Sequence, residues 1–228
     1  MNAAGQQITE DPKTPAELDQ IDHWVRNVPW YDCADNIKTV RVTENTTVGV
    51  TAGGSLNHMF ADCVNLTKCD LTGFDTTNAT SFAYMFQNCR SLTTLSVRNF
   101  ITSHVVYMDY MFDGCIGLEF IELRGSRIAT LEGAFAHCTS LQYVTFPPAF
   151  NTQSTLSMEN LFWGCTGIKS LDLRGLNTMG VQNMNGMFMG CENMISVNLS
   201  KFNVQSALYL ANMFNGCKAL LECDLSTF

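Results

Sequence analysis

Cysteine is the residue type that most invites a chemical interpretation in this 228-residue chain, because ten are present. Thiolates carry out redox reactions and bind metal ions, but a metal site needs ligands that converge from short spacings such as C-x-x-C. No C-x-x-C occurs here. A ladder of small buried side chains is therefore the prediction for the seven cysteines that recur three residues after a phenylalanine: Cys63, Cys89, Cys115, Cys138, Cys165, Cys191 and Cys217.

The remaining cysteines and the four histidines give weaker signals. Cys69 and Cys223 stand where other repeats hold Leu, Ile or Val, so we expect them in the core. Cys33 is left open, as a free thiol or, in a secreted protein, as a disulfide partner of Cys63. No nucleophile elbow, phosphate-binding loop or paired carboxylate motif occurs. We therefore expect no enzyme, no metal and no cofactor, and no ligand pair forms among the scattered histidines: His23, His58, His104 and His137.

The phenylalanine and cysteine columns belong to one repeating unit. Its consensus is Met-Phe-x-x-Cys-x-x-Leu-x-x-Leu-x-Leu, and residues 85–97 follow it closely. Self-similarity at a fixed period indicates a solenoid, in which each unit buries its apolar face against its neighbours. The spacings are 26, 26, 23, 27, 26 and 26 residues between the anchor phenylalanines: Phe60, Phe86, Phe112, Phe135, Phe162, Phe188 and Phe214.

Each part of the unit predicts a local structure. The L-x-x-L-x-L segment predicts one short parallel strand, because its last two apolar positions alternate with polar ones. Apolar residues four and one positions before each anchor phenylalanine predict one or two helical turns on the convex side. Two residues after it stand Asp, Asn, His or Gly, which favour a left-handed backbone. We therefore predict an α/β repeat solenoid, right-handed, with a parallel concave sheet and short helical or irregular convex arms.

The repeat, with Phe74–Phe82 as its linking arm, resembles the BspA-like leucine-rich repeats of bacterial and protozoan surface proteins. The 26-residue subtype is the most similar, and the resemblance covers residues 56–228. Departures occur in the third unit, which is shortened near Ser126–Ile128, and in the fourth, which holds Pro147 and Pro148. The resemblance implies an adhesin or interaction module that is secreted or at the cell surface, and it implies no catalytic residues. A cytoplasmic location is the alternative, because the N-terminus lacks a signal peptide.

The chain divides into a loose N-terminus at residues 1–13, a cap at 14–55 and seven leucine-rich repeats at 56–228. The cap is predicted to hold a helix that ends before Pro29, followed by a degenerate repeat. In that repeat Tyr31 would replace the anchor phenylalanine, with Cys33 one position early. The last unit stops at Phe228, which predicts a truncated or uncapped end. Self-association through that end, in a structural stalk or scaffold of a larger surface protein, is the alternative function.

Composition excludes some partners, and the outward residues of the strands suggest others. A net charge of −8 disfavours binding to nucleic acids and to anionic membranes. The sequence contains no run of 18 apolar residues, so we expect no membrane-spanning segment. Phe120 and Tyr143 are neighbours in one outward column where most units carry Ser, Thr or a charge. Aromatic residues ringed by charges are typical of interface anchors, although a locally covered aromatic pair is the alternative.

The charged members of the candidate site are Arg98, Glu122, Arg124, Asp172 and Arg174. Mutual ion pairing is their alternative role, and exposed pairs contribute little to stability. With the two aromatic residues, they predict a site for a protein or glycan of a host or neighbouring cell.

Overall fold

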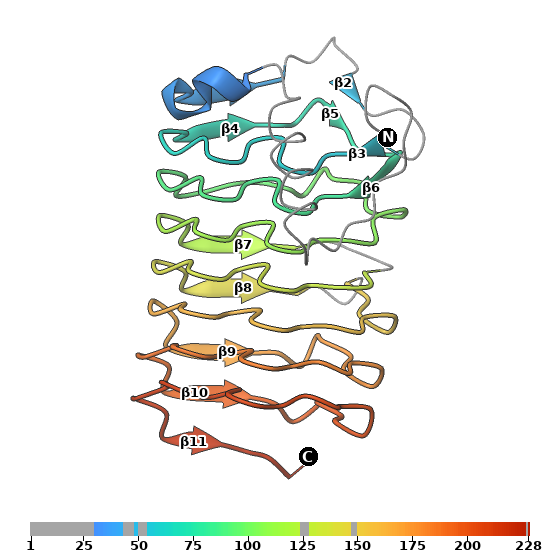
Figure 1. Cartoon of the computed structure of the whole chain (residues 1–228), viewed down its shortest axis with the longest axis vertical. Helices are drawn as coiled ribbons and strands as arrows, with labels where there is room; N and C mark the ends of the chain where they lie inside the picture. The colour runs from blue at the N-terminus through green and yellow to red at the C-terminus, as the bar shows by residue number, and fades with distance from the viewer. Residues whose placement is uncertain (1–29, 43–47, 50–53, 124–127, 147–149, 227) are drawn as a thin grey trace, which may run out of the picture.

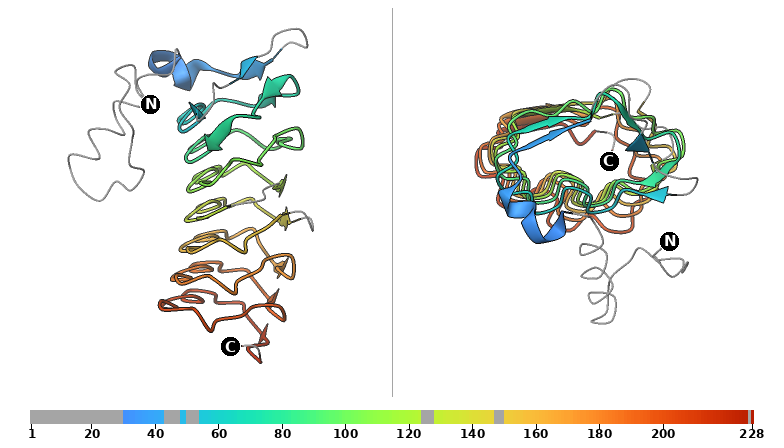
Figure 2. Two further views of the ribbon diagram at one scale, coloured as in Figure 1. Left: turned by 90° about the vertical axis from the view of Figure 1, so that its right-hand side faces the viewer. Right: turned by 90° about the horizontal axis from the view of Figure 1, so that it is seen from above.

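The computed structural model describes residues 30–42, 48–49, 54–123, 128–146, 150–226 and 228, which form one stack of flattened turns (Figure 1). The chain descends by one turn per sequence repeat, so residues such as Ser170 and Ser196 lie side by side. Seen down the stack, the turns superimpose as similar ovals (Figure 2). Residues 1–13 and the predicted helix of the cap lie outside the described residues.

Each strand of the first column is short and parallel to its neighbours, as the L-x-x-L-x-L segment predicts. The pairing follows the sequence columns, with Phe120 beside Tyr143. The middle residue, such as Ile121, is buried, while its neighbours point outward. We call the outward residues of these strands, and of residues 94–98 between them, the strand face. The strands are β1 (Thr39–Arg41), β4 (Lys68–Asp70), β7 (Phe120–Glu122), β8 (Tyr143–Thr145), β9 (Ser170–Asp172), β10 (Ser196–Asn198) and β11 (Glu222–Cys223).

Further along each turn lies a second, less regular column of parallel pairing. β2 (Val48–Gly49) pairs with β5 (Phe74–Asp75), and β3 (Gly54–Ser55) pairs with β6 (Ala79–Ser81). With parallel strands and almost no helix among the described residues, the architecture is a β-solenoid. Beyond β6 the second column continues as isolated parallel bridges, and we call its residues the bridge column: Ser81, Tyr107, Thr130, Ser157, Asn183 and Tyr209.

The pairing along the strand face is interrupted twice, so the predicted continuous sheet is replaced by short blocks. The described strands form separate ladders of β1 with β4, β7 with β8, and β9 with β10 and β11. Residues 94–97 lie between the first two ladders, and they contribute one bridge, from Thr94 to Phe120. Among the described residues, no strand pairing joins β4 to residues 94–97 or β8 to β9.

The arm before each cysteine is a run of tight turns, so the prediction of helical turns there is wrong. Around Phe60, alternate N–H groups donate to the carbonyl three residues earlier: those of Met59, Ala61 and Cys63. The N–H groups between them donate to carbonyls of the next turn: those of His58, Phe60 and Asp62. An α-helix would keep all of these bonds within the arm. The described residues contain one helix, the 3₁₀ helix η1 (Tyr31–Asn36).

Two left-handed residues per repeat make this alternation of bonds possible. The position two residues after each anchor has positive φ, as predicted, with values between 58° at Asn88 and 79° at Gly216. Side chains at such angles strain the backbone, and Tyr84, at φ 59°, is an unusual case. Its ring stacks on His58 and on Tyr110, with centroids 4.6 and 5.2 Å apart, which offsets that strain. The position two residues before each anchor is left-handed as well: His58, Tyr84, Tyr110, Gly133, Asn160, Gly186 and Asn212.

A continuous stack of aromatic rings fills the interior at the anchor position. From Phe60 to Phe214, neighbouring ring centroids are 5.3 to 5.9 Å apart. Trp30 begins the stack, 5.7 Å from Phe60 and nearly parallel to it. The assignment of Tyr31 as the anchor of the degenerate repeat is therefore wrong. Trp30 holds that place, and Cys33 follows it by three residues, as in every other repeat.

Candidate functional site

The cysteine column is buried except at the half-buried Cys217, and it is hydrogen-bonded, which gives its thiols a structural role. From Cys89 to Cys217, each Sγ lies 2.9 to 3.1 Å from the carbonyl oxygen of the anchor phenylalanine one turn earlier. A thiol is a weak donor, so these bonds add direction to the small apolar filling that was predicted. Burial raises the pKa of the Cys191 thiol to about 12, which leaves little reactive thiolate near neutral pH.

The cysteines form neither disulfides nor a metal site within the described part of the chain. All ten are free thiols, so Cys33 is not bonded to Cys63. Cys33 is exposed, and its Sγ lies 3.4 Å from the Trp30 carbonyl oxygen. No cluster of three or more described His, Cys, Asp and Glu side chains could hold a metal ion. Cys69 and Cys223 pack against the core, as predicted.

The described histidines belong to separate local contacts. His58 is buried, and this burial lowers its pKa from 6.5 to about 4, although the nearby Asp62 carboxylate acts in the opposite direction. The exposed His137 has its Nδ1 2.9 Å from Asp113 Oδ1. The ring of His104 is also exposed, with Nδ1 3.0 Å from the Thr77 carbonyl oxygen. The structure therefore brings none of these three histidines to the strand face.

Phe120 and Tyr143 lie side by side near the middle of the strand face. They are Cα partners of β7 and β8, and neighbouring strands lie about 4.8 Å apart. The two residues are 41% and 63% exposed, so the structure does not cover the pair. Thr94 lies beside them in the same outward column. The strand face therefore presents two adjacent aromatic side chains that are free to bury a large area against a partner.

A groove begins at Phe120 and extends over the first interruption of the sheet. Its volume is about 530 Å³. We place Thr94 and Ser96 at its floor, because their small side chains point outward between larger ones of the adjacent turns. Lys68 and Asp70 line one bank, Phe120 and Glu122 line the other, and the remaining lining residues are Thr67, Cys69, Leu95, Val97 and Arg98.

The charged candidates form local ion pairs. Arg98 Nη2 lies 3.0 Å from Glu122 Oε2, which joins two adjacent turns beside the groove. Arg174 binds Asp172 with Nε 2.9 and 3.1 Å from the two carboxylate oxygens and Nη2 2.6 Å from Oδ2. These bonds from Arg174 lower the pKa of Asp172. Arg124 lies outside the described residues.

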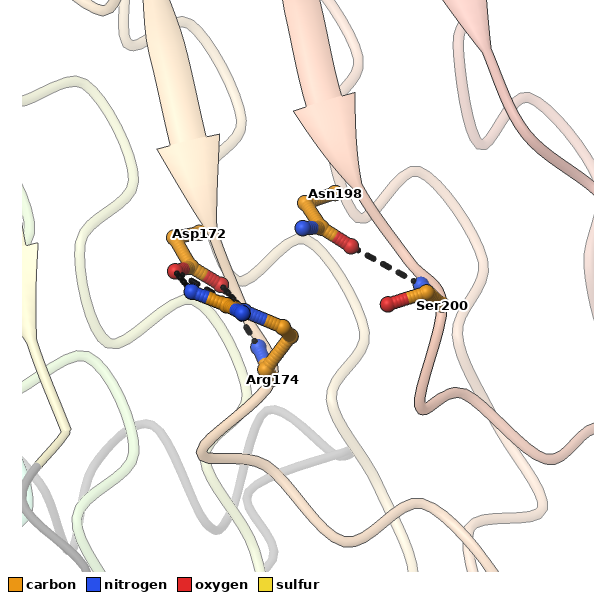
Figure 3. Close-up of polar contacts among 4 residues, drawn as sticks. All are labelled: Asp172, Arg174, Asn198 and Ser200. Atoms are coloured by element: carbon orange, nitrogen blue, oxygen red, sulfur yellow. Dashed lines mark hydrogen bonds and ion pairs between the residues drawn. The ribbon is translucent and has the colours of Figure 1, made fainter.

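Asp172 also turns the chain at the end of its strand, and the same contact recurs in neighbouring turns (Figure 3). Its Oδ1 accepts the N–H of Arg174 at 3.1 Å, and Asn198 Oδ1 accepts the N–H of Ser200 at 3.1 Å. Asp or Asn is favoured here, because it bonds its own backbone two residues on. Asp172 and Arg174 belong to the ladder of β9, and the structure does not bring them to the groove. Two further strand ends use the same contact: Asp70 with Thr72 and Asp224 with Ser226.

Sequence reasoning missed the groove and the position of Lys68 on its bank. One signal was present, since the small Thr94 stands between Lys68 and Phe120 in the outward column. The interruption of the sheet gave no signal, because Leu95 and Val97 fit the strand consensus as well as the residues of the paired strands do.

Residues 42–121 and 122–228 each match a family described as "Mycoplasma protein of unknown function, DUF285". The chain belongs to this family. The two matches meet within β7, so each family unit spans several turns of the DUF285 solenoid. No curated protein sequence matches the chain. In the described part of this DUF285 chain, no helix has the length and apolar character needed to cross a membrane.

Solved structures of bacterial leucine-rich repeat proteins resemble the DUF285 solenoid. The T. pallidum leucine-rich repeat protein TpLRR has a TM-score of 0.50 and 17% identity, with 81% of this chain and 78% of that one covered. A leucine-rich cell surface protein from Faecalibacterium prausnitzii A2-165 has a TM-score of 0.33 and 16% identity, covering 84% and 74%. A protein from Bacteroides ovatus ATCC 8483 has 0.33 and 17%, covering 80% and 59%. The likeness to TpLRR confirms a leucine-rich-repeat-like fold, and the BspA-like subtype remains a prediction.

Proposed function

We propose that this chain is a non-enzymatic binding module that holds a partner macromolecule on its strand face around Phe120 and Tyr143. The observation that carries the proposal is the exposure of these two rings, 41% and 63%, at adjacent positions of one ladder. Aromatic side chains bury a large area with few rotatable bonds, and they are enriched among the residues that dominate interface energetics.

The surroundings of the pair also suit an interface. Arg98 and Glu122 form an ion pair at the edge of the groove, and polar groups at the rim of an interface confer specificity. The groove gives the surface a hollow beside the aromatic anchor, into which part of a partner could fit. The partner would be a protein of a host or neighbouring cell, and a glycan is the alternative outcome of the test.

The described side chains do not favour a catalytic function. The column cysteines are buried with raised pKa values, and the described histidines are engaged in contacts away from the groove. The family to which the chain belongs carries no assigned activity. Secretion or a location at the cell surface is part of the proposal, and it rests on the resemblance of the repeats to surface proteins.

The test is binding of the purified chain to epithelial cells and to immobilised extracellular-matrix proteins. The double variant Phe120→Ser with Tyr143→Ser should lose saturable binding while keeping the circular dichroism spectrum and melting temperature of the wild type. Tyr107→Ser with Tyr209→Ser is the matched control, because it removes two exposed aromatic residues from the bridge column. Equal binding by all three proteins would overturn the proposal.

A further inference from the structure

The groove beside Phe120 lies where the backbone of the sheet is least paired. β4 pairs with β1 on one side, and its other side faces residues 94–97 without a ladder. Residues 95–97 form no strand pairing with the next turn either, since the described bridge to β7 is at Thr94. Strand edges with unpaired N–H and C=O groups are the usual place where a further polypeptide chain adds to a sheet.

The shape of the groove follows the direction of the strands. Thr94 and Ser96 are alternate outward residues, so a ligand above them runs parallel to the chain. Lys68 and Phe120 flank the end at Thr94, because they occupy the same outward column of the adjacent turns. Asp70 and Glu122 flank the other end, two residues further along. An extended polypeptide advances about 3.3 Å per residue, with side chains at the same period as these positions.

The charges at the two ends of the groove differ. Glu122 is paired with Arg98 at 3.0 Å, and Asp70 accepts hydrogen bonds from the hydroxyl and the N–H of Thr72 at 2.7 and 3.1 Å. Lys68 is exposed, and its ammonium group forms no ion pair with a described residue. The end of the groove at Thr94 therefore combines the exposed ammonium group of Lys68 with the exposed ring of Phe120.

We infer that the groove binds an extended segment of a partner protein, with an acidic side chain at Lys68 and an apolar side chain against Phe120. This inference rests on the proposed function and names the kind of partner. A polypeptide suits the groove better than a glycan, because its amide groups can meet the edge of β4 that faces away from β1 and the backbone of residues 95–97, which no described ladder joins to each other. The charge pair contributes specificity and a faster association rate, both of which decrease with added salt.

The first experiment selects short random peptides displayed on phage against the immobilised chain. Enriched peptides should carry Asp or Glu at a fixed spacing from an aromatic or aliphatic residue. A labelled peptide from this pool should bind the chain in a fluorescence anisotropy titration. Enrichment of sequences without an acidic residue would overturn the inference.

Two matched pairs of variants then locate the peptide. Thr94→Trp fills the floor of the groove, and Ser196→Trp places the same side chain in the same outward column several turns away. Lys68→Glu reverses the charge of the bank, and Lys169→Glu does so at an exposed lysine outside the groove. Thr94→Trp and Lys68→Glu should each weaken binding about tenfold or more, while the two controls should bind like the wild type. Equal affinities within either pair would overturn the inference.

A second selection and an exchange measurement test the contacts themselves. Selection against the Lys68→Glu variant should enrich Lys or Arg where the wild type enriched Asp or Glu. Hydrogen exchange of the amides of residues 95–97 should slow when the peptide binds. Unchanged exchange would show that the ligand does not pair with this backbone.

The variants distinguish a failure of the inference from a failure of the proposed function. If the Phe120 and Tyr143 double variant loses binding to cells while Thr94→Trp and Lys68→Glu do not, the aromatic pair binds something other than this peptide. If the double variant keeps all binding, the proposed function itself is overturned.

Discussion

The arm and the strand face belong to the same turns, yet they differ in how strictly they repeat. In the arm, each repeat keeps an anchor ring, a cysteine three residues later and left-handed residues on both sides of the ring, and every anchor from Phe60 to Phe188 is buried. On the strand face, the outward residues change from turn to turn, and the ladder is interrupted twice. The arm therefore holds the stack together, which leaves the strand face free to vary, as the proposed binding site requires.

The largest expected effect is on the ring stack of the arm. Phe135 is fully buried between the rings of Phe112 and Phe162. Phe135→Ala should lower the free energy of unfolding by about 3–5 kcal/mol, because it leaves a cavity in a packed interior. Tyr143→Ala on the strand face should change it by less than about 0.5 kcal/mol. Urea denaturation followed by circular dichroism measures both, and equal losses would show that the strand face stabilises the fold as much as the ring stack does.

The next largest effect is a pH dependence of the unfolding free energy, and it arises from His58, two residues before the first anchor phenylalanine. Burial lowers the pKa of His58 to about 4 in the folded chain, whereas a histidine in contact with water has a pKa of 6.5. Protons therefore bind the unfolded chain more readily, so the stability that neutral His58 contributes is complete above pH 6.5. It is lost as pH falls from 6.5 towards 4, and the loss amounts to about 3 kcal/mol at pH 4.

His58→Phe tests this pH dependence, because it keeps a ring against Tyr84 and removes the titrating group. Between pH 7 and 4, the variant should lose about 3 kcal/mol less unfolding free energy than the wild type. Carboxylates titrate in both proteins, so the difference between them isolates the histidine. If both proteins lost the same unfolding free energy, His58 would have the same pKa in the folded and unfolded chains.

A smaller effect distinguishes two roles of the cysteine column. Cys165→Ala removes a buried sulfur atom and its bond to the Phe135 carbonyl oxygen, and it should cost about 1–2 kcal/mol. Cys165→Ser restores a hydroxyl donor to that oxygen, so its stability should lie within about 1 kcal/mol of the alanine variant. A serine variant less stable by more than about 2 kcal/mol would show that only apolar filling matters there.

The smallest effect is expected at the end of β9. Arg174 and Asp172 are both more than half exposed, and such pairs contribute about 0–1 kcal/mol. Arg174→Ala should therefore change the melting temperature very little. Asp172→Ala should cost about 1 kcal/mol, because it also removes the acceptor that turns the chain. If Arg174→Ala lost more stability than Asp172→Ala, the outward side chains of the strand face would contribute to the stability of the stack.

Much of this fold could be predicted because the repeat fixes which residues share a column. The parallel strands, the buried cysteines and the left-handed residue after each anchor all follow from that alignment. The helical turns were wrong, because an i, i+3, i+4 spacing arises equally in a run of tight turns. Gly133, Gly186, Asn160 and Asn212, two residues before their anchors, carried the missing signal, since they favour a left-handed backbone inside the supposed helix.

The candidate site was predicted only in part. Outward alternation placed Phe120 beside Tyr143 and Arg98 near Glu122, and the structure agrees. Whether adjacent strands form a ladder depends on how closely the turns approach, and no residue pattern encodes that distance. The groove and the role of Lys68 could therefore not be predicted. The start of the ring stack was misassigned because Trp30 and Tyr31 are adjacent, and either could have stood in the anchor column.

The column of hydrogen-bonded thiols also provides probes of local unfolding along the stack. A buried thiol such as that of Cys115 or Cys191 meets an alkylating reagent only when its turn separates from the next. Turns of a solenoid contact only their neighbours, so each can open with its own free energy. Alkylation rates, resolved cysteine by cysteine by mass spectrometry, would therefore give a profile of opening free energies along the stack, with a natural probe in every turn.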